Sequence, residues 1–165
     1  MGFLTGKTAI ITGAGRAVLK DGSCGSIGYG IATAYAKEGA NLVITGRNVK
    51  KLEAAKQELE SLYGIKVLTV QADVCAGGDN EATVANVVKQ AVDTFGGIQV
   101  LINNAQASAS GVPLAEHTTE QFDLAIYSGL YAAFYYMKAC YPYLAESHGS
   151  VICLLYTSPS PRDTR

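Results

Sequence analysis

The sequence predicts an α/β protein built on a doubly wound parallel sheet that is truncated after its fifth strand. Apolar runs alternate with amphipathic stretches from residue 7 to residue 152, which is the order of strands and crossover helices in such a sheet. A glycine-rich loop separates the first apolar run from the first helix. The run at 98–102 is nearly free of polar residues, as expected for a strand that is buried on both faces.

The first half of the chain predicts two strand–helix units. Residues 7–12 form a short β-branched run, and the helix expected at 27–38 spaces its apolar residues three and four apart. Residues 41–45 predict the second strand. Asn48 is expected to cap a second helix, whose apolar stripe lies opposite a lysine-rich face, and Gly64 is expected to end it.

The second half continues the alternation. Residues 66–71 predict the third strand, 79–95 the third helix and 98–102 the fourth strand. A sequence typical of a capping box opens a long helix over 118–143, and a fifth strand begins at 149–152. Because parallel strands are joined by right-handed crossovers, we expect helices on both faces of the sheet.

The composition excludes several classes of protein. A chain of 165 residues suits one domain, and its 48% apolar content and net charge of −1 fit neither a disordered segment nor a nucleic-acid binder. No apolar run approaches the ~20 residues that span a bilayer, and the N-terminus lacks a signal-like core. We therefore expect no membrane contact and a cytoplasmic location. The cysteines and histidines show no zinc-ligand spacing, so no metal is expected.

The C-terminal residues break the pattern of the rest. Residues 154–165 are rich in Ser, Pro and Arg, and a natural linker or tail is one reading of this composition. Residues 153–163 also resemble the translated sequence of a transposase adapter used in sequencing libraries, and all of these positions match it. We therefore expect residues 1–152 to be the natural domain and 153–165 to be a non-native tail.

A glycine-rich turn joins the first strand to the first helix. Gly13 and Gly15 follow the strand, and Ser26, Ile27 and Gly28 open the helix after a polar stretch. Glycines let a backbone approach phosphate groups closely, and a helix N-terminus adds free N–H groups and a positive dipole. The turn is therefore predicted to bind the pyrophosphate of a dinucleotide.

Four places within residues 1–152 resemble the short-chain dehydrogenase/reductase family, whose members have a Rossmann fold. They are similar to the family's glycine motif, its Asp-Val pair, its Asn-Asn-Ala-Gly motif and the strand before its catalytic serine, at 12–28, 72–74, 103–105 and 149–152 respectively. The resemblance implies hydride transfer between a nicotinamide cofactor and a small-molecule carbonyl or alcohol. It also implies a parent protein that is a homodimer or homotetramer.

Arg47 decides the expected choice of cofactor. In such folds a carboxylate after the second strand binds the 2′-hydroxyl of NAD, whereas an arginine pairs with the 2′-phosphate of NADP. Gly46 and Arg47 occupy that place, so NADP is expected in preference to NAD, with Arg16 as an additional contact. The resemblance places Asp73 and Val74 at the adenine.

The end of the fourth strand completes the expected cofactor site. Asn103, Asn104 and Ala105 resemble the family motif, and two amides directly after a buried strand are otherwise difficult to explain. Gln106 replaces the glycine of this motif, and Gly129 stands where many members carry an asparagine of the proton relay. These two departures favour an alternative from another class, a non-catalytic protein that binds NADP to regulate a partner.

The glycine loop itself departs from the family pattern. About eight residues, 17–24, are inserted in it, and Ser26 stands where the family usually has its second glycine. This serine is similar to the Ser-Ile-Ala turn of enoyl-acyl-carrier-protein reductases, so enoyl reduction is a further alternative.

No catalytic residue is assigned. The family uses a tyrosine whose pKa is lowered by a lysine four residues later, with a serine that orients the carbonyl. None of the ten tyrosines precedes a lysine at that spacing, and Tyr156 and Ser158 lie in the adapter-like string. We expect the missing residues to follow Ile152 in the natural protein, and this chain alone to be inactive.

The predicted long helix carries an aromatic stripe. Its members recur at spacings of three and four and are Tyr127, Tyr131, Phe134, Tyr135, Lys138 and Tyr141. We expect this stripe to lie in the core or at a subunit contact, and part of it to be exposed in this chain. His117 and His148 are expected at the surface.

Overall fold

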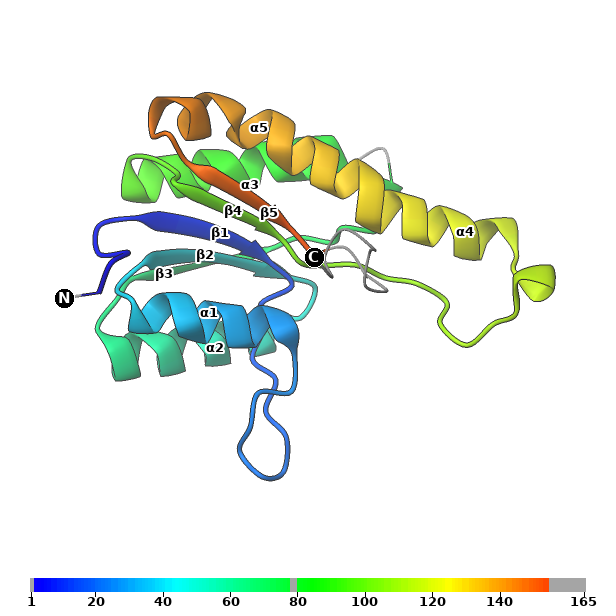
Figure 1. Ribbon diagram of the computed structural model, residues 1–165, viewed down its shortest axis with the longest axis horizontal. Coiled ribbons are helices and arrows are strands. Elements are labelled where there is room, and N and C mark those ends of the chain that lie inside the picture. Colours follow the sequence, from blue (N-terminus) through cyan, green and yellow to red (C-terminus); the bar gives the residue numbers. More distant parts are fainter. Residues whose placement is uncertain (1, 78–79, 155–165) are drawn as a thin grey trace, which may run out of the picture.

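The structure is a computed structural model that describes residues 2–77 and 80–154. Its strands form one parallel sheet in the order β3-β2-β1-β4-β5, which confirms the predicted fold class (Figure 1). The bounds of the strands are Thr8–Thr12 (β1), Asn41–Gly46 (β2), Val67–Gln71 (β3), Val100–Asn103 (β4) and Ser150–Cys153 (β5). The strand order reverses between β1 and β4, and ligands of such sheets bind in the crevice at this switch point.

Helices cover both faces of the sheet, as expected. α1 and α2 pack on one face, whereas α3 and α5 pack on the other (Figure 1). The bounds of these helices are Ile27–Lys37 (α1), Val49–Tyr63 (α2), Asn80–Phe95 (α3) and Ala132–Glu146 (α5). Asn48 caps α2 by accepting a hydrogen bond from the N–H of Lys51, and Gly64 ends α2 in the left-handed conformation.

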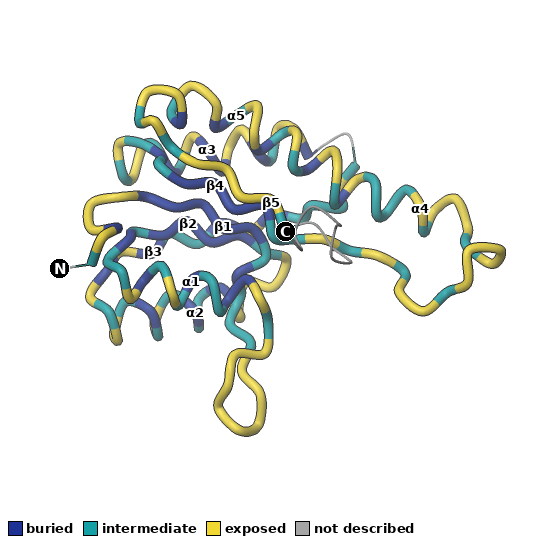
Figure 2. Tube along the Cα trace, viewed as in Figure 1, coloured by how far each residue is buried: buried dark blue, intermediate teal, exposed yellow. Residues whose placement is uncertain are grey.

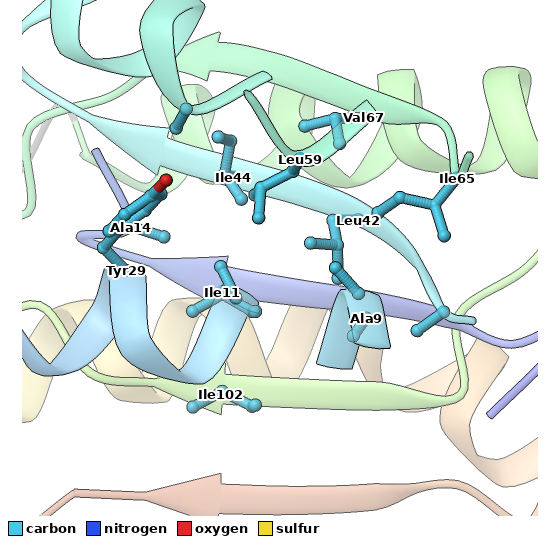
Figure 3. Close-up of a cluster of buried hydrophobic side chains, with 14 of the residues drawn as sticks. Ala9, Ile11, Ala14, Tyr29, Leu42, Ile44, Leu59, Ile65, Val67 and Ile102 are labelled. Atoms are coloured by element: carbon cyan, nitrogen blue, oxygen red, sulfur yellow. The ribbon is translucent and has the colours of Figure 1, made fainter. Parts of the chain in front are cut away.

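Each face of the sheet has its own apolar core. Successive side chains of β1 alternate, so that Ile11 packs under α1 and α2 and Ile10 packs under α3 and α5. Figure 3 shows the first of these clusters, in which Leu42 and Ile44 of β2 meet Leu59 of α2. Burying one such side chain contributes about 1.5–3 kcal/mol to folding. The central strands β1 and β2 are buried, while β5 is exposed along its length at the edge of the sheet (Figure 2).

The predicted long helix is present, but it is not a regular α-helix. It consists of α4 (Thr119–Ala125), a π-helical segment η3 (Ile126–Tyr131) and α5, after a short 3₁₀ turn η2 (Leu114–Glu116). The predicted capping box is confirmed, since Thr118 and Gln121 exchange side-chain and backbone hydrogen bonds. α4 has no buried residue and extends away from the sheet (Figure 1).

Several predicted boundaries shift by one to three residues. The fourth strand begins at Val100 rather than residue 98, because the ladder with β1 starts at Val100. Ile98 is buried, which explains its apolar character, but it lies before the ladder. Cys153, which we expected in the tail, is the last residue of β5, and the N–H of Leu154 still donates to the Asn103 carbonyl. Residue 79 of the predicted third helix and residues 155–165 of the predicted tail lie outside the described residues.

The insertion in the glycine loop forms a small hairpin that projects from the sheet (Figure 1). Val18 and Cys24 form an antiparallel bridge, and the N–H of Leu19 donates to the Ser23 carbonyl. The N–H of Gly25 donates to the Ala17 carbonyl at 2.7 Å, which closes the base of the hairpin. The inserted residues therefore leave and re-enter the loop at nearly the same place.

Two sequence-based exclusions can be compared with the described parts of the chain. Within residues 2–77 and 80–154, no helix has the length and apolar character needed to cross a membrane. Over the same ranges, no three His, Cys, Asp or Glu side chains cluster as metal ligands would.

Gly28 should be intolerant of a side chain, whereas Gly30 on the same helix should accept one. A Cβ on Gly28 would lie 2.3 Å from the Gly13 carbonyl oxygen, but a Cβ on Gly30 would lie 3.8 Å from its nearest neighbour. We expect Gly28→Ala to lower the free energy of unfolding by about 1–3 kcal/mol and Gly30→Ala to raise it by up to about 1 kcal/mol. Urea unfolding of both variants measures this, and equal effects would contradict the packing described.

Candidate functional site

Three adjoining hollows lie at the carboxyl ends of β1, β2 and β4, where the strand order reverses. We call them the loop hollow (about 250 Å³), the strand hollow (about 220 Å³) and the apolar hollow (about 500 Å³). The loop hollow is lined by Gly13, Gly15, Ala17, Ser26, Gly46, Arg47, Asn48, Lys51 and Leu52. The strand hollow is lined by Gly13, Thr45, Gly46, Arg47, Ala72, Asp73, Val74, Cys75, Asn104, Ala105, Gln106 and Ala107. Shared lining residues connect the strand hollow to both of the others.

The structure brings most of the predicted cofactor residues to this crevice. The nine that line at least one hollow are Gly13, Gly15, Ser26, Arg47, Asp73, Val74, Asn103, Asn104 and Ala105. Arg16, Ile27 and Gly28 line none of the three. Gly28 acts through packing instead, because its missing side chain lets α1 lie against the Gly13 carbonyl and the Asn104 amide.

The N-terminus of α1 opens beside the loop hollow. The Ser26 hydroxyl caps α1 by accepting a hydrogen bond from the N–H of Tyr29. Within the described residues, no protein group accepts a hydrogen bond from the N–H of Ile27 or Gly28. Two free N–H groups and the positive end of the helix dipole together form an arrangement suited to an anion.

A hydroxyl group that sequence reasoning missed ties the two central strands together. Thr12 Oγ1 accepts hydrogen bonds of 2.9 Å from the N–H groups of both Asn104 and Ala105. The Asn104 side chain in turn donates to the Thr12 carbonyl at 2.8 Å. Asn104 therefore holds the glycine loop against the end of β4. The sequence signal for this contact was a threonine at the end of a strand, directly before the glycines.

Arg47 and Asp73 flank the strand hollow. Arg47 is exposed and forms no ion pair with any residue of 2–77 or 80–154. One Asp73 oxygen accepts a hydrogen bond from the N–H of Cys75 at 3.0 Å, so this carboxylate also caps the turn after β3. Burial, followed by the nearby Asp73 carboxylate, raises the pKa of the Cys75 thiol, so that it stays protonated at neutral pH.

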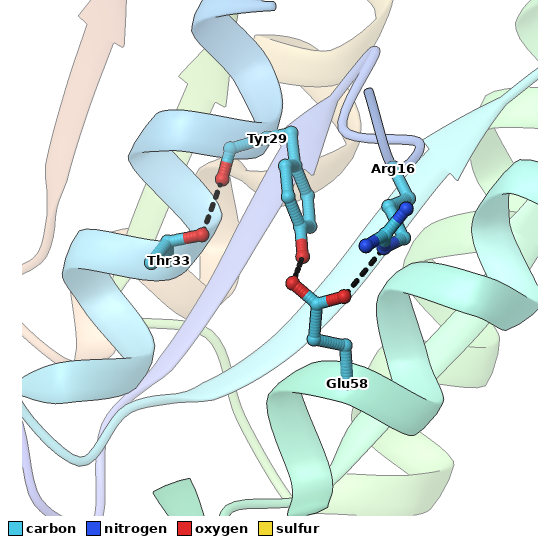
Figure 4. Close-up of polar contacts among 4 residues, drawn as sticks. All are labelled: Arg16, Tyr29, Thr33 and Glu58. Carbon is cyan, nitrogen blue, oxygen red and sulfur yellow. Dashed lines mark hydrogen bonds and ion pairs between the residues drawn. The ribbon is translucent and has the colours of Figure 1, made fainter. Parts of the chain in front are cut away.

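Arg16 was expected to contact the cofactor, but in the structure it lines none of the three hollows. Its Nε donates to Glu58 of α2 at 2.5 Å, and the Tyr29 hydroxyl donates to the other oxygen of the same carboxylate (Figure 4). These hydrogen bonds, that of Tyr29 and then that of Arg16, lower the pKa of Glu58. Glu58 therefore stays ionised and keeps the Arg16 guanidinium on the side of α2.

The apolar hollow lies on the far side of the crevice, between β4, η3 and α5. It is lined by Thr12, Val74, Asn103, Ala105, Gln106, Ala125, Ser128, Gly129, Leu130, Ala132, Ala133, Phe134, Tyr136, Met137, Cys153 and Leu154. The two departures from the family pattern face each other here, since a Cβ on Gly129 would lie 3.6 Å from Gln106 Nε2. The Gln106 amide therefore fills part of the space that a side chain at position 129 would need.

Ser128 accounts for the π-helical turn beside this hollow. Its hydroxyl accepts a hydrogen bond from the N–H of Ala107 at 2.9 Å and donates to the Leu124 carbonyl at 2.7 Å. A buried hydroxyl that bonds a carbonyl four residues earlier competes with the helix's own hydrogen bonds and distorts it. Such π-helical turns are frequent at functional sites.

Tyr136 is the buried tyrosine of the apolar hollow, and its properties argue against an acid–base role. Burial raises the pKa of its phenol to about 12. Catalytic tyrosines of the family need the opposite shift, which a nearby lysine provides. No lysine follows Tyr136 by four residues, so no residue of the chain is assigned to catalysis.

The sequence profile of the family described as Enoyl-(Acyl carrier protein) reductase matches residues 22–160. The chain therefore belongs to this family, within the short-chain dehydrogenases/reductases. It is 61% identical over 152 residues to the 12alpha-hydroxysteroid dehydrogenase of Clostridium sp., in a match that covers 92% of this chain and 56% of that protein.

Solved structures share the fold of the chain. An alcohol dehydrogenase from the archaeon Thermococcus sibiricus, complexed with 5-hydroxy-NADP, superposes with a TM-score of 0.78 and 28% identity over 89% of this chain and 57% of that one. The L-sorbose reductase of Gluconobacter frateurii, complexed with NADPH and L-sorbose, gives a TM-score of 0.78 and 30% identity over 93% and 53%. The chain thus spans little more than half the length of these relatives.

Removing the Thr12 hydroxyl should loosen the connection between β1 and β4. Thr12→Val leaves the partly buried N–H groups of Asn104 and Ala105 without their acceptor, and each unpaired N–H costs about 1–2 kcal/mol. We expect the free energy of unfolding to fall by about 2–4 kcal/mol. Thr12→Ser keeps the hydroxyl and is the matched control. If both variants unfold at the same urea concentration, the hydroxyl is not the connecting group.

Proposed function

We propose that this chain forms the NADP-binding part of an oxidoreductase that transfers a hydride between the nicotinamide and a hydroxyl or carbonyl group of a steroid. The observation that carries the proposal is the crevice at the switch point of the sheet, in a chain 61% identical to a 12alpha-hydroxysteroid dehydrogenase over 152 residues. Because the chain spans 56% of that relative, the activity is proposed for the complete protein.

The residues present fit a dinucleotide. The contact between Gly28 and the Gly13 carbonyl holds α1 close to the loop hollow, where the free N–H groups of Ile27 and Gly28 suit the pyrophosphate. Asp73 and Val74 would hold the adenine in the strand hollow, and Arg47 would pair with the 2′-phosphate. When bound, NADP supplies the hydride acceptor of the reaction, and the protein provides binding and orientation.

The apolar hollow is the proposed entrance for the substrate. Its lining is mostly aliphatic and aromatic, with Leu130, Phe134 and Met137 contributed by η3 and α5. A largely apolar cavity of about 500 Å³ with few polar groups suits a rigid hydrocarbon ligand such as a steroid. The Gln106 amide also lines this hollow, from the loop after β4, and would offer such a ligand a polar contact.

Enoyl reduction is a second candidate function. It is favoured by the description of the matching family and by Ser26, which replaces a glycine of the loop. In the structure Ser26 acts as the cap of α1, a role that any dinucleotide-binding helix could use. The dehydrogenase proposal is preferred, because it rests on 61% identity to one relative over 152 residues, whereas the family description applies to the family as a whole.

We also propose that the complete protein is a homo-oligomer that uses the exposed face of η3 and α5. Tyr131, Phe134 and Tyr141 of the predicted aromatic stripe are 44%, 52% and 70% exposed, respectively. An apolar face of this kind marks an interaction site. Sedimentation of the complete protein tests this, and a monomer at micromolar concentration would argue against it.

The complete gene product should oxidise a 12α-hydroxysteroid with NADP and reduce the corresponding ketone with NADPH. Reading the natural gene beyond codon 152 should reveal a serine and then a Tyr-x-x-x-Lys sequence, and residues 153–165 should be absent from it. The present chain, which has no tyrosine–lysine pair at that spacing, should show no turnover. Absorbance at the nicotinamide band follows the reaction. Reduction of an enoyl thioester but not of a keto-steroid would favour the second candidate.

Arg47→Ala should weaken NADPH binding selectively. Arg47 lines both the loop hollow and the strand hollow, where the 2′-phosphate is proposed to bind, and a charge-assisted hydrogen bond contributes about 1.5–3 kcal/mol. We expect the Kd for NADPH to rise about tenfold to a hundredfold and the Kd for NADH to stay nearly unchanged. Fluorescence titration of the complete protein measures both constants. An equal loss for the two cofactors would show that Arg47 does not contact the 2′-phosphate.

A further inference from the structure

In the described part of the chain, the charged side chains that line the loop hollow are both positive. Among the described residues, Arg47 and Lys51 are the only ionisable ones that line it, and both are exposed. Neither forms an ion pair with a residue of the described ranges 2–77 and 80–154. The hollow therefore carries two cations, and no carboxylate of the described residues lines it.

The third cation of this region is already paired. Arg16 lies on the same loop, but its Nε is held by Glu58 at 2.5 Å, and the Tyr29 hydroxyl fixes the other carboxylate oxygen (Figure 4). Arg16 does not line the hollow. Any anion bound there would consequently meet Arg47 and Lys51 rather than Arg16.

Two hydrogen bonds hold the backbone of Lys51 beside the loop. Its N–H donates to Asn48 Oδ1 at 3.0 Å, and its carbonyl accepts from the N–H of Arg16 at 2.8 Å. A Cβ on Gly15 would lie 3.1 Å from Lys51 Cβ, so the absent side chain of Gly15 lets the loop lie directly against this lysine. The flexible side chain of Lys51 thus starts at the edge of the loop hollow. Lys51 also lies in the first turn of α2, where the helix dipole favours an anion.

We propose that Lys51 is a second specificity-determining residue, which binds the 2′-phosphate of NADP together with Arg47. This inference rests on the proposed binding of NADP. The loop and strand hollows join at Gly13, Gly46 and Arg47, between the expected places of the pyrophosphate and the adenine. The adenosine ribose would lie at this junction, where Arg47 lines both hollows and Lys51 lines the loop hollow. Lys51 therefore supplies a second positive charge, beside that of Arg47, for a dianionic phosphate.

The test compares two ligands that differ by the 2′-phosphate, adenosine 2′,5′-bisphosphate and adenosine 5′-monophosphate. Calorimetric titration of the complete protein gives a Kd for each, with Lys51→Ala, Lys51→Arg and the control Lys50→Ala. Lys50 is exposed on the same helix turn but lines none of the three hollows. We expect Lys51→Ala to weaken the bisphosphate about fivefold to tenfold and the monophosphate less than about twofold. Lys51→Arg should restore binding of the bisphosphate, and Lys50→Ala should resemble the unaltered protein.

The outcomes separate this inference from the proposed function. Loss of affinity for both ligands in Lys51→Ala would place the lysine at the 5′-phosphate and overturn the inference, as would no loss for either ligand. If Lys50→Ala weakens binding as much as Lys51→Ala does, the effect is general electrostatic attraction, and the inference is overturned. If the unaltered protein binds neither ligand, the proposed function itself is wrong. If it binds both equally, NADP preference is wrong while dinucleotide binding stands.

Discussion

The close approach of α1 to the end of β1 is the constraint on which the rest of the site depends. Gly28 allows the helix to pack against the Gly13 carbonyl and the Asn104 amide, at distances that no side chain would permit. This packing places the N-terminus of α1 beside the crevice. It also holds the glycine loop, which joins β1 to α1, against the residues that follow β4. Thr12 adds the complementary contact, since its hydroxyl joins the same loop to the backbone after β4.

The distribution of charge follows from this geometry. The loop carries Arg16 toward α2, where Glu58 binds it together with the Tyr29 hydroxyl. Both groups of this ion pair are about a third exposed, so the pair contributes to orientation more than to stability. As a consequence, Arg16 is held at α2, and the cations that line the loop hollow are Arg47, which follows β2, and Lys51, in the first turn of α2.

The apolar side of the crevice depends on contacts between the loop after β4 and the long helix. The Ser128 hydroxyl bonds Ala107 of that loop, and the helix widens locally into a π-helical turn. The same turn brings Gly129 against Gln106. The two residues that depart from the family pattern are therefore one structural feature, in which a larger side chain on the loop accompanies a missing side chain on the helix.

The sequence by itself determined the order of strands and helices, the caps at Asn48 and Thr118 and the glycine positions of the loop. These features depend on hydrophobic period and on local backbone conformation, which a short stretch of residues specifies. Only the tertiary structure decided the partner of Arg16, because Glu58 is 42 residues away along the chain. It also decided the π-helical turn at Ser128 and the place of Lys51, which by pattern alone belonged to the solvated face of α2. Such contacts join side chains from separate elements, so they exist only after the elements have packed.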